Sequence, residues 1–353
     1  PIAGVSVLRF RNQSHSNHHF RWTDPMSTVL EHYTKEDLLS RTSVRSGEQR
    51  LGERIATVSE ADWTSADSLS FKFVLVGVEE DFGVRANHGR GGADRAFQSF
   101  LSYFLNMQVN RFFPTEAVAV LGAVVPTTAI ENDQIDALRE ATAANDHTVS
   151  AVVRRITELG AIPIVIGGGH NNAYGCLKGS SEAKGRAINC LNIDAHTDLR
   201  TTEGRHSGNG FTYAADAGYM ANYFILGLQE NYTPEYIWQT IEHNDAYNVA
   251  SFEDLQSGEL TQDEALIHIA EHLGMEYGLE LDVDAIANFP SSAQSVSGFS
   301  FDQVRQIIYA LDMLPHYFHL CEGRVTSEEE NALVGRGLAL LVSDFIKAHI
   351  FSE

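Results

Sequence analysis

The chain has 353 residues, 43% of them hydrophobic, and its 25 basic and 47 acidic side chains give a formal net charge of −22. This acidity disfavours nucleic acids and anionic membrane surfaces as partners. No apolar run approaches the roughly 18 residues of a membrane span, and no signal peptide is visible.

The cysteine content indicates the compartment. The three cysteines, Cys176, Cys190 and Cys321, are odd in number and have no C-x-x-C spacing. This usage is typical of small buried residues in a reducing environment, so we expect a cytoplasmic protein.

The length allows two domains, although α/β chains of this size often form one.

The first 68 residues are polar, rich in Ser, Arg and His, and have no sustained hydrophobic period. We predict an N-terminal arm or extension over residues 1–68, followed by the main domain over 69–353. His15, His18 and His19 form a cluster in this arm. Because they have no partner residues, we interpret them as part of a flexible or packed arm rather than a metal site.

The first convincing strand covers residues 71–78 and leads into a glycine-rich loop that carries Arg85, Asn87 and Arg90. The carboxyl ends of strands are where open α/β sheets bind ligands. These side chains can bind carboxylates by charge-assisted hydrogen bonds, or they can brace the loop against neighbours or a partner subunit. The sequence leaves both interpretations open.

Strand and helix patterns then alternate. Apolar side chains have helical spacing over 93–105 and 132–159, whereas 117–125, 161–166 and 187–193 read as strands. This alternation is typical of a mostly parallel sheet with helices on both faces. We therefore predict an α/β fold of three layers, α/β/α.

The strand at 161–166 runs into Gly167, Gly168, Gly169 and His170. Glycines at this place let the backbone approach a site closely or adopt positive φ. A phosphate-binding loop is the competing interpretation. It is weaker, because this turn has neither the G-x-x-x-x-G-K-[ST] pattern nor G-x-G-x-x-G.

The next strand ends in three metal-competent side chains, Asp194, His196 and Asp198. In an extended backbone, residues i, i+2 and i+4 point to one side, so all three can meet one ion or a pair of ions. A solvated cluster in a surface turn is the alternative.

A polar, glycine-rich loop over 199–211 follows and contains His206 and Asn209. A histidine on such a loop can reach over the metal strand as a proton carrier, or it can bond to its own backbone. Asn209 is a candidate substrate contact.

A later strand, from residue 278, carries Asp282 and Asp284 on one side. Burying two like charges side by side costs several kcal/mol unless cations lie between them. The alternative is a strand that reaches the surface by residue 282. We predict further strands at 223–228, 248–252 and 317–321, and helices at 262–273, 301–311 and 328–350.

Three strand ends thus supply four aspartates and two histidines: His170, Asp194, His196, Asp198, Asp282 and Asp284. Six ligands are too many for one catalytic zinc ion, which usually takes three. Carboxylate oxygens with a minority of imidazoles suit Mn²⁺. We therefore expect a centre of two metal ions.

GGGH, DAHTD and DVD, in this order on strand ends, resemble the ureohydrolase superfamily of arginase, agmatinase and formimidoylglutamase. The resemblance spans roughly residues 43–348 and implies an arginase-like fold with a catalytic domain over 69–353. In arginases a third aspartate and a proline follow closely after DVD, whereas this chain has Ala287 and Asn288 there. The chain looks most similar to formimidoylglutamase, in segments 79–87, 89–92, 106–110, 203–211 and 319–323.

The resemblance also implies roles. Two Mn²⁺ per subunit would activate a water that attacks an amidine carbon, with His206 as proton shuttle and Asp198 or Asp284 as proton donor. Glu322, directly after the last strand, would pair with the planar cation of the substrate. A surface glutamate is the alternative. Homo-oligomers are usual in this superfamily.

The most favoured function is hydrolysis of formimidoylglutamate to glutamate and formamide, a step of histidine degradation. The first alternative is a guanidino hydrolase, such as an arginase, agmatinase or guanidinobutyrase. Such an enzyme would use the same metal ligands and release urea from its substrate. The second is a non-catalytic protein of this fold that only binds a ligand. Retention of all six ligands disfavours the second alternative.

Overall fold

The computed structural model describes residues 28–128, 130, 134–274, 276–311 and 313–351. The histidine cluster at residues 15, 18 and 19 lies outside the described residues. No helix within the described part of the chain is long and apolar enough to cross a membrane.

Ten strands of the described chain form one sheet in the order β1-β4-β3-β5-β10-β9-β6-β7-β8, with β2 paired to β4. Every pairing is parallel except that of β1 with β4. The strands are β1 (Thr28–His32), β2 (Ala56–Thr57), β3 (Phe73–Val78), β4 (Val118–Pro126), β5 (Ile162–Ile166), β6 (Ile188–Ile193), β7 (Met220–Leu228), β8 (Tyr247–Ser251), β9 (Tyr277–Asp282) and β10 (Phe318–Cys321).

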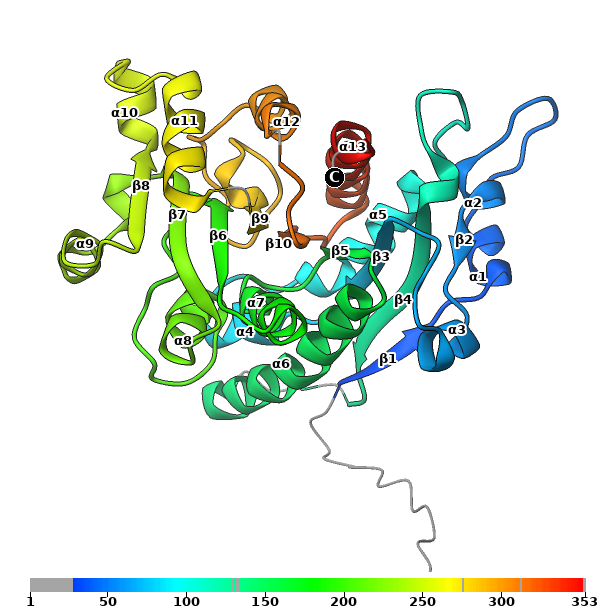
Figure 1. The fold of residues 1–353 in the computed structure, drawn as a ribbon, viewed down its shortest axis with the longest axis horizontal. Coiled ribbons are helices and arrows are strands. Elements are labelled where there is room, and N and C mark those ends of the chain that lie inside the picture. Colours follow the sequence, from blue (N-terminus) through cyan, green and yellow to red (C-terminus); the bar gives the residue numbers. More distant parts are fainter. Residues whose placement is uncertain (1–27, 129, 131–133, 275, 312, 352–353) are drawn as a thin grey trace, which may run out of the picture.

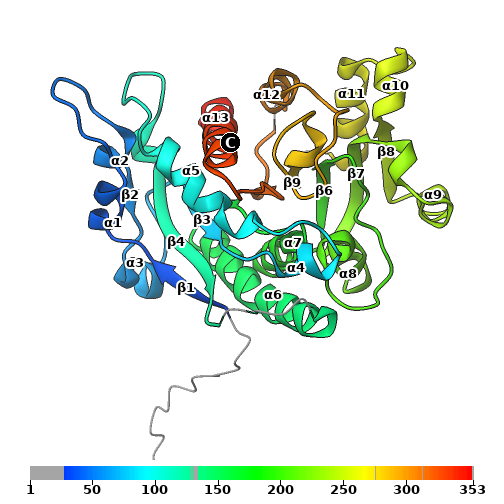
Figure 2. The same cartoon turned by 180° about the vertical axis from the view of Figure 1, so that it is seen from behind.

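Helices cover both faces of this sheet, as Figures 1 and 2 show. One face packs against α5 (Ala96–Phe104), α11 (Gln262–Leu273), α12 (Phe301–Ala310) and α13 (Glu328–His349). The other packs against α6 (Ile135–Glu158), α7 (Asn172–Lys184), α8 (Gly210–Asp216) and α9 (Glu235–Glu242). The predicted three-layer fold with a mostly parallel sheet is confirmed.

The described part of the N-terminal segment lies along one edge of the sheet. Strand β1 pairs with β4 in antiparallel register, and β2 adds to β4 in parallel. Three short helices accompany these two strands: α1 (Lys35–Ser40), α2 (Leu51–Arg54) and α3 (Glu60–Ser65). Two further short helices, α4 (Phe82–Ala86) and α10 (Phe252–Ser257), follow β3 and β8. The domain boundary at residue 68 stays a prediction.

Four neighbouring strands, β5, β10, β9 and β6, lie side by side in the middle of the sheet. They are mutually parallel, so their carboxyl ends meet at one edge. The segments that follow them begin at Gly167, Glu322, Val283 and Asp194. Strand order alone therefore gathers the predicted metal-binding segments, at the edge where open α/β sheets place their ligands.

Candidate metal centre

The structure brings all six predicted metal ligands together as two groups that share one residue. His170, Asp194, Asp198 and Asp282 offer ligand atoms within 4.8 Å of one another, and so do Asp194, His196 and Asp284. Because Asp194 belongs to both groups, the arrangement suits two neighbouring ions rather than one.

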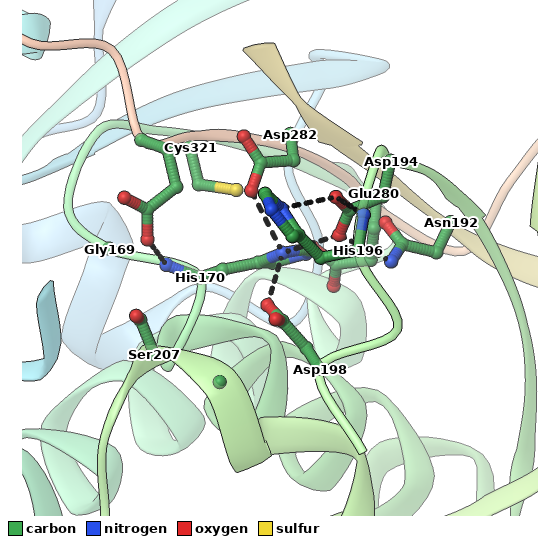
Figure 3. A network of polar contacts seen from close by, with 12 residues as sticks. Gly169, His170, Asn192, Asp194, His196, Asp198, Ser207, Glu280, Asp282 and Cys321 are labelled. Atoms are coloured by element: carbon green, nitrogen blue, oxygen red, sulfur yellow. Dashed lines mark hydrogen bonds and ion pairs between the residues drawn. The ribbon is translucent and has the colours of Figure 1, made fainter. Parts of the chain in front are cut away.

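His170 lies at the centre of the first group (Figure 3). Its Nδ1 atom is 2.9 Å from Asp198 Oδ2, 3.2 Å from Asp194 Oδ2 and 3.4 Å from Asp282 Oδ2. The imidazole is fully buried, and Phe211 packs edge-on against it with ring centroids 5.1 Å apart. This packing restricts rotation of the ring.

His196 completes the second group nearer to solvent. Its Nδ1 atom is 3.4 Å from Asp284 Oδ1 and 3.6 Å from Asp194 Oδ1. The ring stacks on Tyr232 with centroids 5.4 Å apart. The second group therefore borders the opening of the site, whereas the first lies deeper.

Local backbone bonds hold the carboxylates in place. Asp194 Oδ1 accepts from the His196 N–H at 2.7 Å, and Asp282 Oδ1 accepts from the Asp284 N–H at 2.9 Å. Each aspartate thus bonds two residues along its own chain, as Asx turns do. Asp198 has a φ of 49°, an unfavourable left-handed conformation of the kind that clusters at functional sites.

The electrostatics of these groups fit cations. Burial, and then the charges of Asp284 and Asp194, hold the pKa of Asp282 well above its usual range. His170 Nδ1 and Asp284 Oδ1 are buried, and despite their charged neighbours neither has a partner in hydrogen-bond geometry among the described residues. Carboxylates with two imidazoles are a suitable donor set for Mn²⁺, and bound cations would satisfy these atoms.

The glycine turn after β5 has its amides occupied by protein groups. The Gly169 N–H donates to Glu80 Oε1 at 3.3 Å, and the His170 N–H donates to Glu322 Oε1 at 2.7 Å. The Gly167 N–H donates to the Leu320 carbonyl. These bonds leave the turn unsuited to cradle a phosphate, so its glycines serve the close approach of His170 to the neighbouring strand ends.

A cavity of about 460 Å³ opens onto the two groups. Of the predicted metal ligands, His196, Asp198, Asp282 and Asp284 line it, and Glu322 lines it too. Its mouth carries Asn87, His88, Arg90, Arg200, Ser207, Tyr232 and Ser292. Arg85 is directed elsewhere, with Nη1 3.3 Å from Asp81 Oδ1 and Nη2 donating to the Ile130 carbonyl.

Glu322 projects into this cavity from the end of β10. Its Oε1 atom accepts from the His170 N–H, whereas Oε2 is buried without a hydrogen-bond partner among the described residues. Burial raises the pKa of Glu322 to about 8. Its φ of 65° is again left-handed for a residue with a side chain.

His206 does not line the cavity. The residue is 1% exposed, Nδ1 accepts from the Gly208 N–H at 3.1 Å, and Nε2 lies 3.2 Å from Glu203 Oε1. Burial lowers its pKa to about 4. These contacts match the alternative of a loop histidine bonded to its own backbone, and the proton-shuttle role stays an untested prediction.

Asn209 also lies inside the loop, fully buried and away from the cavity lining. It accepts from Arg205 Nη1 and from the His206 N–H, and it donates to the carbonyls of Thr201 and Gly204. All of these hydrogen bonds brace the loop. The predicted substrate contact at Asn209 therefore has no support from its position.

The sequence profile of the Arginase family matches residues 71–319 of this chain. The chain belongs to the arginase family. A formimidoylglutamase of Salmonella heidelberg is 30% identical over 71% of this chain and 77% of its own length. One of Streptococcus gordonii is 33% identical over 45% of this chain and 47% of that protein, so this match spans about half of the relative's length.

Solved structures share the arginase-family fold. Trypanosoma cruzi formiminoglutamase with Mn²⁺ aligns with a TM-score of 0.69 over 87% of this chain and 100% of that chain, at 18% identity. Formimidoylglutamase of Bacillus subtilis aligns with a TM-score of 0.70 over 88% of this chain and 95% of that chain, at 16% identity. At these identities the likeness shows the fold alone.

Two features of this arginase-family site escaped the sequence reasoning. Arg200 stands at the cavity mouth only two residues after Asp198, and Glu280 lies behind the centre two residues before Asp282. The expected extended backbone does not reach Asp198 or Asp284, because β6 ends at Ile193 and β9 ends at Asp282. Glu280 lies on β9 itself, so the period-2 pattern of that strand could have included it. Arg200 lies beyond β6 and has no such signal, and neither has Tyr232, in a short 3-10 helix, or Ser292, in a turn.

Glu322 gives the metal-free protein a defined pH dependence. Its folded pKa of about 8 exceeds the ordinary value of 4.5, so between these values the folded state keeps a proton that the unfolded state has lost. Stability therefore falls as pH rises through this window, by up to ~1.4 kcal/mol per pH unit from this group. Urea unfolding in chelator should show a shallower fall for Glu322→Gln than for the wild type. Equal slopes for the two proteins would refute the raised pKa.

Proposed function

We propose that this arginase-family protein hydrolyses a linear C–N amidine bond, with formimidoylglutamate as substrate and glutamate and formamide as products. This assigns it to histidine degradation. The main supporting observation is a single cavity with metal-ligand groups and Glu322 at its base and two arginines at its mouth. A substrate with a cationic amidine end and anionic carboxylates complements both regions.

His170, Asp194, Asp198 and Asp282 would hold one Mn²⁺, and Asp194, His196 and Asp284 the other. When bound, such a pair of ions lowers the pKa of water towards neutrality and orients it for attack. Because both groups contain Asp194, its carboxylate would contribute to both metal sites.

Glu322 would hold the amidinium. A carboxylate matches the planar donors of an amidinium, and Oε2 of Glu322 has no competing partner among the described residues. A cation beside this buried group favours its ionised form. Substrate binding thus supplies the positive charge that Glu322 lacks in the free protein, and the substrate carbon is held beside the metal groups.

The reaction also needs a proton at the leaving nitrogen. Water adds its oxygen to the amidine carbon, the bond from that carbon to the glutamate nitrogen breaks, and a proton passes to this nitrogen. Asp198 and Asp284 both line the cavity and can carry that proton. His206 is turned into its own loop.

Two arginines at the cavity mouth support an anionic substrate. Arg90 donates from Nε to the Ser292 carbonyl at 3.1 Å, and neither Arg90 nor Arg200 has a carboxylate within ion-pair distance in the described part of the chain. Both guanidiniums line the cavity, so they are available to an anionic substrate. They favour formimidoylglutamate, with two carboxylates, over agmatine, which has none.

The shared aspartate predicts metal stoichiometry. Asp194→Asn should lose both Mn²⁺ ions, because its carboxylate belongs to both groups, whereas Asp284→Asn should keep one ion held by the His170 group. Metal analysis after gel filtration gives the ratio of manganese to chain. If Asp194→Asn retained two ions, the shared ligand set would be wrong.

The substrate proposal is tested with a panel. The manganese-loaded protein is incubated with formimidoylglutamate, arginine, agmatine and guanidinobutyrate, and formamide and urea are measured. We expect formamide from the first and no urea from the others. Urea from arginine without turnover of formimidoylglutamate would instead identify a guanidino hydrolase.

Arg200 should contribute binding more than chemistry. Arg200→Ala removes a charged hydrogen-bond donor worth about 1.5–3 kcal/mol, so KM for formimidoylglutamate should rise about 10- to 100-fold with a smaller change in kcat. Arg154→Ala, at a helix surface beside Glu158, is the matched control and should leave KM unchanged. An unchanged KM in Arg200→Ala would remove this arginine from the substrate site.

A further inference from the structure

A carboxylate and an imidazole lie directly behind the metal centre. Glu280 and His319 are both fully buried, and His319 Nδ1 is 2.5 Å from Glu280 Oε2. They are register partners on the parallel strands β9 and β10. Glu280 precedes Asp282 by two residues, so it occupies the next inward position on the same side of β9.

The Glu280 carboxylate also faces His170. Figure 3 shows Glu280 beside Asp194 next to this ring. Oε2 of Glu280 is 3.6 Å from His170 Nε2, whereas the three aspartates lie nearest to Nδ1 of the same ring. This separation is longer than a hydrogen bond, so the interaction is electrostatic. His170 thus has one nitrogen directed at the metal groups and the other at Glu280.

This placement matters because an imidazole binds a metal only through a nitrogen without a proton. In His170, three carboxylates surround Nδ1, where a metal ion would bind, and the Glu280 carboxylate lies nearest to Nε2. Metal-ligating histidines generally direct their second nitrogen at such a carboxylate or carbonyl.

We propose that Glu280 and His319 form a positioning pair that holds the His170 ring with Nε2 toward Glu280 and so presents Nδ1 to the first metal ion. His319 donates to Glu280 and holds its carboxylate in place between the two imidazoles. Neither residue lines the cavity, so neither meets the substrate. The inference rests on the metal centre of the proposed function and not on the identity of the substrate.

The test is a manganese titration of the metal-free protein by calorimetry and EPR, without substrate. Glu280→Gln keeps the size of the side chain but removes its charge, and it should weaken the ion at the His170 group about 10- to 100-fold. The ion at the group of Asp194, His196 and Asp284 should change less. Glu280→Asp, which keeps the charge, should recover part of the affinity.

His319 should act through Glu280. His319→Leu should weaken the same ion, and the double variant with Glu280→Gln should be no weaker than the worse single variant, because the residues work as one unit. Asp344→Asn is the stability control: Asp344 is buried on α13, 2.5 Å from Arg305 Nε, and outside the cavity lining. It should lower the melting temperature without altering manganese affinity.

Three results would overturn the pairing. They are wild-type affinity for both ions in Glu280→Gln, equal weakening of both ions in proportion to lost stability, and a third manganese per chain that disappears with Glu280 or His319. The third result would make Cys176, Glu280 and His319, whose ligand atoms lie within 4.8 Å, a metal site of their own. Because no substrate is added, failure of the substrate panel leaves this test unaffected.

Discussion

Mutual repulsion among buried carboxylates is the constraint on which this structure depends. Asp194, Asp282 and Asp284 are each at most 2% exposed. Asp198 joins them, with Oδ2 2.9 Å from His170 Nδ1. Without compensating charge, such a cluster holds protons or disrupts the sheet edge. Burial first, and then the charges of Asp284 and Asp194, raise the pKa of Asp282. Bound cations would relieve the repulsion, so metal binding and the stability of the centre would be coupled.

The sheet makes this arrangement possible by placing each donor at the end of a rigid strand. Four parallel neighbours deliver the segments, short backbone bonds fix the aspartates, and left-handed φ angles at Asp198 and Glu322 aim their side chains. Behind them, Glu280 and His319 continue the same strands inward. The centre is therefore built in layers, with the candidate ligands at the strand ends and the groups that we propose to orient them one step deeper.

The loops around the cavity divide into a fixed part and an open part. Arg205 pairs with Asp146, lies between Tyr174 and Tyr213, and bonds Asn209, so the loop after the DAHTD segment is tightly braced. Arg90 and Arg200 instead remain directed to the cavity mouth. Specificity within this arginase-family scaffold would then depend on a few mouth residues, while the metal ligands stay common to several substrates.

The sequence by itself determined the three-layer fold, the strands from β3 to β10, five of the longer helices and the six candidate ligands, because buried strands read as apolar runs that end in polar side chains. The strands β1 and β2 and the short helices were not predicted, because their apolar stretches are too short to show a period. Tertiary structure decided what local pattern does not encode. The sequence suggests that His206 and Asn209 can reach a substrate. In the fold, hydrogen bonds with Arg205 and with backbone amides hold both side chains inside the loop. In the sequence, nothing distinguishes Glu280 from its neighbours on the strand. In the fold, the register of β9 and β10 sets it beside His319, and its carboxylate lies 3.6 Å from His170 Nε2. Which polar side chains face a cavity depends on contacts between segments far apart in the chain, and only the packed fold sets those contacts.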